Sequence, residues 1–196
     1  KNTILLVGSA PQYPHGTVDP IQAIAKLALK HKLPLHVDAC MGGYLLPWVE
    51  KLGYEVPLFD FRCKGVTSIS ADCHKYAFAI KGASVLMFAD SSYRQYQFSV
   101  CTTWPGGLYA SPSMSGTKGG GSLASAWASI VSLGEKGFMK TAAKIMKASK
   151  SIQKSVTQID GIIVYGKPHM SCVGFGSDDP KLNIFSVGDA LEELGW

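Results

Sequence analysis

Short apolar runs that alternate with a helix-like segment are the feature that most restricts the fold of this chain. An apolar run at residues 4–7 precedes apolar residues at helical spacing over 21–32, and a second apolar run follows at 35–39. A strand–helix–strand unit of this kind is typical of a parallel sheet with helices over it. The sequence therefore predicts an α/β protein.

The same alternation continues toward the middle of the chain. Asp19 and Pro20 are typical of a helix N-cap and first turn, and Ser122 is expected to cap a later helix. Gly134 is expected to interrupt the helical pattern that follows. The expected elements are helices over 21–32, 44–52, 122–133 and 138–158, and strands over 4–7, 35–39, 67–71 and 83–89, the last two as a hairpin.

The pattern changes after residue 160. Strands are expected over 162–165 and 170–175, with a helix over 185–194, which resembles the start of a small α+β domain. We therefore expect a large α/β domain over 1–134, a connecting helix over 135–158 and the beginning of a second domain over 159–196.

Charge is scarce and uneven along the sequence. Charged residues make up 17% of the chain, and the net charge of +5 permits an anionic ligand without requiring nucleic acid. Lys118 is the only charge between positions 95 and 134, but Gly and Pro residues there break any apolar helix that could cross a membrane. A lysine stripe at helical spacing predicts a solvated helix face: Lys140, Lys144, Lys147, Lys150 and Lys154.

The five cysteines form no Cys-x-x-Cys pair, so neither a disulfide framework nor a structural zinc site is expected. Buried free thiols in a reducing compartment fit this pattern better.

Asp38 is the first candidate site residue, because it lies near the C-terminal end of an expected parallel strand, where open α/β sheets bind ligands. With His36 and Cys40 it could ligate a metal ion, since alternate residues share one side of a strand. It could instead cap the following turn. A third interpretation is a carboxylate that faces a protonated heterocyclic nitrogen.

Lys75 is the second candidate, because it follows the expected strand over 67–71. Most lysines are surface residues, but a buried lysine has a lowered pKa and forms imines. A Lys that forms a Schiff base and an Asp that keeps the pyridine nitrogen protonated are the minimal pyridoxal phosphate site. Asp38 and Lys75 together predict such a site, with Ser70 and His74 as phosphate donors.

Five segments together resemble the sphingosine-1-phosphate lyase family, over nearly the whole chain. They are Pro-Gln-Tyr-Pro-His-Gly at 11–16, His-Val-Asp-Ala-Cys at 36–40, Phe-Asp-Phe-Arg at 59–62, the run from Gly-Val-Thr to His-Lys-Tyr at 65–76, and Trp-Pro-Gly-Gly-Leu-Tyr-Ala-Ser-Pro at 104–112. The His-Lys motif alone would indicate only the wider group II of fold-type-I pyridoxal phosphate decarboxylases. The segments at 59–62 and 109–112 narrow the resemblance to the lyases.

The resemblance implies a fold, a reaction and partners. The chain would be part of the fold-type-I large domain, a mostly parallel sheet with flanking helices, followed by the start of the small C-terminal domain. With pyridoxal 5'-phosphate, it would cleave the Cα–Cβ bond of a phosphorylated sphingoid base by a retro-aldol reaction. The products would be a long-chain aldehyde and phosphoethanolamine. The family works as a homodimer with a site shared between subunits.

The resemblance also implies roles for individual residues. The catalytic candidates are Lys75, Asp38, Lys81 and Tyr13; the cofactor-binding candidates are Lys75, Asp38, Cys40, Ser70, His74 and Thr117; and the substrate-binding candidates are His15, Lys81 and Lys118. Lys81 has a competing interpretation as an ordinary turn lysine, and Tyr13 and His15 as ordinary turn residues. Thr117, Lys118 and a glycine replace the Ser, Arg and Pro of the family's loop, so its phosphate contacts are expected to differ.

Two other functions remain open. The chain could belong to a group II amino-acid decarboxylase, or it could be a fragment that acts only with the rest of an enzyme, because the family's chain is much longer at both ends. No membrane segment or nucleic-acid partner is expected. The resemblance implies a cytosolic or cytosol-facing location, at the endoplasmic reticulum membrane for a eukaryotic form.

Overall fold

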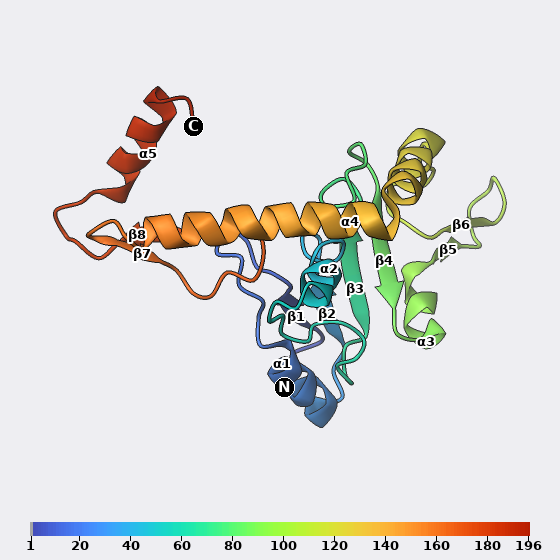
Figure 1. Ribbon diagram of the computed structural model, residues 1–196. Helices are drawn as coiled ribbons and strands as arrows, with labels where there is room; N and C mark the ends of the chain where they lie inside the picture. Colours follow the sequence, from blue (N-terminus) through green and yellow to red (C-terminus); the bar gives the residue numbers. More distant parts are fainter. Residues whose placement is uncertain (1) are drawn as a thin grey trace.

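A four-stranded sheet forms the centre of the molecule in the computed structural model, which describes residues 2–196. The strands are β1 (Leu6–Ser9), β2 (Leu35–Asp38), β3 (Ser68–Asp72) and β4 (Ser84–Phe88), in that spatial order (Figure 1). The first three strands are parallel, and β4 is antiparallel to β3. The structure thus confirms an α/β fold with a mostly parallel sheet and the hairpin between the third and fourth strands.

The helices α1 (Ile21–His31), α2 (Leu46–Lys51) and α4 (Gly120–Val156) contribute to one side of the core. In Figure 1, α4 runs across the sheet with α2 beneath it. Trp48 of α2 stacks on Phe138 of α4, with ring centroids 5.3 Å apart. Gly134 has φ +52° inside α4 and divides it into two helical parts, as expected from the sequence.

The two faces of the sheet are chemically different. Leu35 and Val37 of β2 and Ile69 of β3 are buried beneath the helices. Because side chains alternate along a strand, Asp38 and Ser70 belong to the opposite face, where they are only half-buried. The polar candidates on β2 and β3 therefore share the face that the core helices do not cover.

Two expected caps are wrong. The Asp19 carboxylate accepts a hydrogen bond from the backbone N–H of Ser9 at 2.7 Å, and α1 begins after Pro20 without a side-chain cap. Ser122 lies inside α4, and its hydroxyl donates back to the carbonyl of Gly119 at 3.2 Å. The side chains of Asp19 and Ser122 thus bind backbone groups that the local sequence pattern does not reveal.

The remaining elements are small and add no strand to the central sheet. They are α3 (Ser91–Arg94), the 3₁₀ turn η1 (Gln95–Gln97), the hairpins β5 (Ser99–Cys101)–β6 (Tyr109–Ser111) and β7 (Ile162–Val164)–β8 (Phe175–Ser177), and α5 (Ile184–Glu193). Figure 1 shows α5 at the opposite end of the molecule from β5 and β6. The division into domains at 134 and 158 remains a proposal.

The strand expected over 170–175 is wrong for most of its length. The hydroxyl of Ser149 in α4 donates to the carbonyl of Met170 at 2.6 Å, and the N–H of His169 donates to the carbonyl of Gly16 at 2.9 Å. This backbone therefore bonds to a helix and a loop instead of a strand partner, and Met170 is fully buried in the core. Only Phe175 and the two residues after it form β8.

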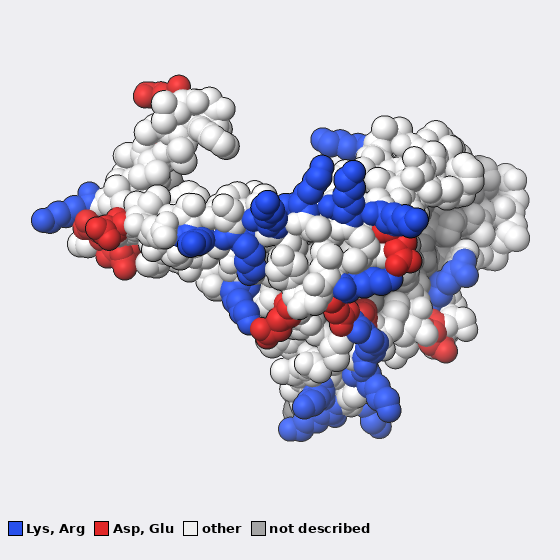
Figure 2. Space-filling model, in the orientation of Figure 1, with Lys and Arg blue, Asp and Glu red and all other residues white. Residues whose placement is uncertain are grey.

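Lysines lie along α4 on its solvent side, as Figure 2 shows in blue. All five members of the predicted stripe are exposed, which confirms the solvated face. Among the described residues, no helix combines the length and apolar character needed to cross a membrane. Five cysteines are free, but only Cys63 and Cys73 are buried as expected; Cys40 and Cys172 are half-buried, and Cys101 on β5 is exposed.

His169 is expected to make stability depend on pH. Its Nδ1 accepts a hydrogen bond from the N–H of Val18 at 3.1 Å, which requires an unprotonated Nδ1. Burial lowers the pKa of His169, and so do Lys167 and Lys150, while Glu55 opposes them. The unfolded chain therefore binds a proton more readily than the native state, and the free energy of unfolding should fall as the pH drops below the ordinary histidine pKa of about 6.5.

Urea midpoints measured between pH 8 and pH 5 check this expectation. His169→Gln, which keeps an acceptor but cannot titrate, should flatten the decline near pH 6. An unchanged slope in this variant would show that His169 is not responsible.

Candidate active site

Lys75 lies in the turn that follows β3, and two side chains accept hydrogen bonds from its amine. Its Nζ donates to Asp72 Oδ2 at 2.9 Å and to Cys40 Sγ at 2.9 Å. The turn is closed by backbone hydrogen bonds from Lys75 to Asp72 and from Ala79 to Cys73. Because β2 and β3 are parallel neighbours, the end of β2 brings Cys40 to the lysine that follows β3.

Asp38 is the last residue of β2, and its carboxylate is held from two directions. Oδ1 accepts from the N–H of Cys40 at 3.0 Å and from the hydroxyl of Ser70 at 3.3 Å. Partial burial acts to raise the pKa of Asp38, but these hydrogen bonds and nearby His36 outweigh it, so the pKa is lowered. Asp38 therefore stays ionised at neutral pH. The hydrogen bond that it accepts from the N–H of Cys40 also caps the turn after β2.

The metal interpretation of this strand is not supported. Both ring nitrogens of His36 face hydroxyls, with Nδ1 2.8 Å from Ser68 Oγ and Nε2 3.2 Å from Ser70 Oγ. Cys40 faces Lys75 instead of His36. Within residues 2–196, no group of three or more His, Cys, Asp or Glu side chains could hold a metal ion.

Asp72 is a site residue that sequence reasoning did not single out. Besides Lys75, it accepts a hydrogen bond from Ser84 Oγ at 2.6 Å, and His74 Nε2 lies 3.6 Å from its Oδ2. His74 Nδ1 donates to the carbonyl of Ala83 at 2.9 Å, so His74 is oriented by the residue that precedes β4. The spacing of three residues between Asp72 and Lys75 could have suggested their contact. The orientation of Asp72 depends on Ser84 of β4, which the spacing does not reveal.

The expectation of a lowered pKa for Lys75 is wrong in this state of the site. Desolvation acts to lower it, but the contacts with Cys40 and Asp72 prevail, and the pKa of Lys75 is raised. Lys75 is also only half-buried. The amine is therefore charged at neutral pH until one of these contacts is replaced.

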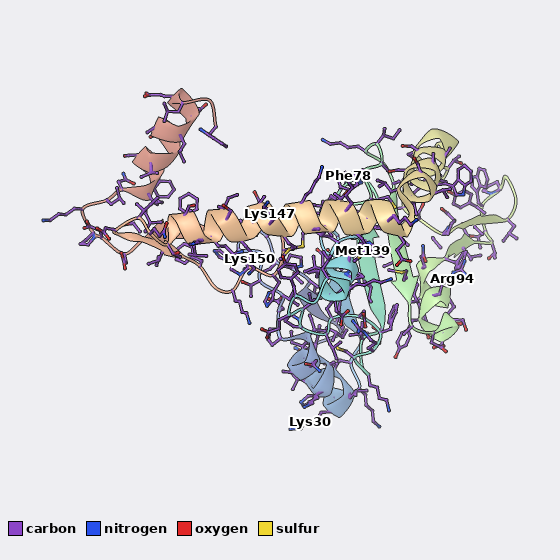
Figure 3. The ribbon with its side chains drawn as sticks, in the orientation of Figure 1. Lys30, Phe78, Arg94, Met139, Lys147 and Lys150 are labelled. Carbon is purple, nitrogen blue, oxygen red and sulfur yellow. The ribbon has the colours of Figure 1, made fainter. Side chains whose placement is uncertain are left out.

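A hollow beside Lys75 gives the amine access to a ligand. It is lined by Tyr13, Cys40, Met41, Lys75, Tyr76 and Phe78. Phe78, labelled in Figure 3, directly follows Ala77, whose carbonyl accepts a hydrogen bond from Ser129 of α4 at 2.6 Å. The hollow therefore lies between the turn after β3, the turn after β2 and the loop that carries Tyr13.

The loop over residues 12–18, here the Tyr13 loop, is held by the segment over 165–174, here the clamp segment. Gln12 Nε2 donates to His15 Nδ1 at 2.8 Å, and the ring of His15 meets Tyr165 edge-on at 5.4 Å. Tyr76 and Ser171 are joined through their hydroxyls. Tyr13 itself is 77% exposed at the rim of the hollow. The sequence did not indicate that the clamp segment supports the site.

Three predicted residues are not brought to Lys75 within this chain. Lys81 and Thr117 are exposed. Lys118 lines a separate hollow over the uncovered sheet face, together with His36, Ser68, Ser70 and Ser84. Ser70 thus borders both the Asp38 carboxylate and the hollow that Lys118 reaches.

The amino-acid sequence matches a known protein family. The model of the pyridoxal-dependent decarboxylase conserved domain matches residues 8–177. A sphingosine-1-phosphate lyase of Drosophila melanogaster is 47% identical over 196 residues, all of this chain and 36% of that protein. One from Oryza sativa is 49% identical over 195 residues and 36% of its length. The chain spans about a third of the length of these curated relatives.

Solved structures agree with the sequence relatives. The structure of a sphingosine-1-phosphate lyase from Burkholderia pseudomallei has a TM-score of 0.94 and 45% identity, over 100% of this chain and 44% of that one. A glutamate decarboxylase of Lactobacillus brevis has a TM-score of 0.76 at 21% identity, over 97% of this chain and 44% of its own. The second likeness supports the fold alone.

Proposed function

Because the chain belongs to the pyridoxal-dependent decarboxylase family, we propose that it supplies the cofactor lysine of a lyase for phosphorylated sphingoid bases. The enzyme would cleave such a substrate, sphingosine 1-phosphate among them, to a long-chain aldehyde and phosphoethanolamine. The observation that carries this proposal is identity of 45–49% to relatives named as sphingosine-1-phosphate lyases, across the whole chain. The arrangement of Lys75 and Asp38 supplies the chemistry.

The residues present fit pyridoxal phosphate. Lys75 presents an amine at the edge of a hollow, and the carboxylate of Asp38 is ionised on the neighbouring strand. Ser70 and His74 offer a hydroxyl and an imidazole close to these groups. An amine, a fixed anion and neutral donors are the groups that the aldehyde, the ring nitrogen and the phosphate of this cofactor require.

When bound, pyridoxal phosphate supplies an aldehyde that condenses with amines and a ring that accepts an electron pair. Lys75 would hold the cofactor covalently through Nζ. Asp38 would hold a proton at the ring nitrogen, and the hydrogen bonds from Cys40 and Ser70 keep its carboxylate oriented for this task. Cys40 and Tyr76 line the hollow and would exclude water beside Lys75.

The substrate-binding roles are proposals that rest on position and charge. Tyr13 lies at the rim of the hollow, and the Tyr13 loop places His15 nearby. Lys81 and Lys118 are exposed cations that could receive a phosphate. Since Lys118 and Thr117 do not approach Lys75 of their own chain, they would act in the site of a neighbouring subunit.

We also propose that the enzyme is a homodimer. The first part of α4 exposes large apolar side chains, among them Leu123 at 54%, Trp127 at 69% and Val131 at 61%. An exposed apolar face of this kind is typical of a subunit interface. The free thiols support a reducing compartment, so we place the enzyme in the cytosol or facing it.

A product assay tests the proposed function. Incubation of the purified protein with pyridoxal phosphate and sphingosine 1-phosphate should release a long-chain aldehyde and phosphoethanolamine, detected by mass spectrometry. Incubation with glutamate or aromatic amino acids should release no carbon dioxide. Carbon dioxide without aldehyde would instead identify an amino-acid decarboxylase, and neither product would reject both enzymes for this chain.

A further inference from the structure

Asp72 is the only carboxylate among the described residues that contacts the Lys75 amine. The amine has two acceptors at the same distance of 2.9 Å, Asp72 Oδ2 and Cys40 Sγ. Burial raises the pKa of the Cys40 thiol, so this sulfur is neutral at neutral pH and a weak acceptor. The ammonium ion of Lys75 and the carboxylate of Asp72 carry opposite charges, so this contact is an ion pair as well as a hydrogen bond, whereas the thiol offers only a neutral acceptor. Asp72 therefore dominates the position of the amine.

The carboxylate of Asp72 is itself fixed by β4. Asp72 and Ser84 are register partners in the antiparallel pair, and Ser84 Oγ donates to Oδ1 at 2.6 Å. Lys75 and Ser84 thus bind different oxygens of one carboxylate. Burial acts to raise the pKa of Asp72, but Ser84, Lys75 and His74 outweigh it, so Asp72 remains an anion. Two further titratable side chains, Tyr76 and Tyr13, line the hollow with Lys75, and burial raises the pKa of Tyr76.

We propose that Asp72 is a positioning residue that holds the Lys75 amine as an ammonium ion, aimed at the end of β2, whenever Lys75 is not bonded to the cofactor. This positioning role of Asp72 follows from the side chains that surround Nζ. It rests on the proposed function in one respect, that Lys75 carries the cofactor. Before its lone pair can attack an aldehyde carbon, the ammonium ion must give one proton to water. Asp72 therefore raises the pH at which Lys75 becomes nucleophilic.

Trace labelling of the cofactor-free protein with acetic anhydride tests this proposal. The labelling rate of Lys75, followed by mass spectrometry across pH, reports the fraction of free amine. In Asp72→Asn the profile should move by about one pH unit toward acid, so that Lys75 is labelled about tenfold faster at pH 7.5. Cys40→Ser keeps a neutral acceptor beside the amine, so it should move the profile less than Asp72→Asn does.

Matched variants separate positioning from misfolding. Asp72→Glu retains the charge and should restore most of the parent profile, whereas Asp160→Asn removes an exposed carboxylate elsewhere and should not move it. Unfolding midpoints confirm that each variant is folded. An Asp72→Asn profile that coincides with the parent profile would overturn the proposal. Because neither cofactor nor substrate is used, failure of the lyase assay with a shifted profile would reject the proposed function alone.

Discussion

Replacing Lys75 with alanine should abolish covalent capture of pyridoxal phosphate and reduce lyase turnover by at least about 10³-fold, since the reaction loses its nucleophilic amine. Nζ of Lys75 lies at the edge of the hollow between the turns that follow β2 and β3. Treatment with borohydride should add the reduced cofactor to the peptide that contains Lys75 in the parent protein. Mass spectrometry should find no such addition in Lys75→Ala.

Lys64→Ala is the matched control, because it removes an exposed lysine from the same part of the chain. It should capture the cofactor as the parent protein does. Equal covalent labelling of the parent protein and Lys75→Ala would show that another amine carries the cofactor, and the assignment of Lys75 would fail.

Replacing Asp38 with asparagine should leave the cofactor bound to Lys75 but lower kcat by about 10²- to 10⁴-fold, the range of a lost proton-holding group. Asparagine has nearly the same shape and retains an oxygen for the N–H of Cys40 and the hydroxyl of Ser70. It has no negative charge, so it cannot stabilise a proton on a pyridine nitrogen. Steady-state kinetics and the absorbance spectrum of the bound cofactor check both parts of this expectation.

Asp160→Asn again serves as control, because it makes the same chemical change on the surface. If Asp38→Asn retained the parent kcat, Asp38 would be left with its structural role as the cap of the turn after β2. Loss of cofactor capture in Asp38→Asn would point to a binding defect instead, and would separate this outcome from a catalytic one.

The central fold could be predicted from the sequence because it depends on local patterns. The apolar runs around Val37 and Ile69 are buried strands, and Gly134 breaks α4 where its position in the helical pattern suggested. Predictions failed where a distant partner decided the structure. Asp19 looked like a helix cap but binds the N–H of Ser9, and the segment around Met170 looked like a strand but bonds to α4.

The candidate site follows the same division. Asp38 and Lys75 could be placed at the same edge of the sheet, because Asp38 ends one strand and Lys75 follows the parallel strand beside it, an arrangement that the alternation of elements predicts. Asp72 could not be recognised, because its orientation depends on Ser84 across the hairpin. The joined hydroxyls of Tyr76 and Ser171, which are 95 positions apart, were equally inaccessible to local reasoning.

The clamp on the Tyr13 loop also constrains the order in which the molecule is assembled. The hydrogen bond from Val18 to His169 spans 151 positions of the chain. During synthesis, the Tyr13 loop leaves the ribosome long before the clamp segment exists, so it cannot form these contacts until the clamp segment, which follows α4, has been made. Closing so long a loop also costs chain entropy that contacts between near neighbours do not. The rim of the candidate active site therefore cannot be completed before the clamp segment is made, although all four strands of the central sheet precede α4 in the chain.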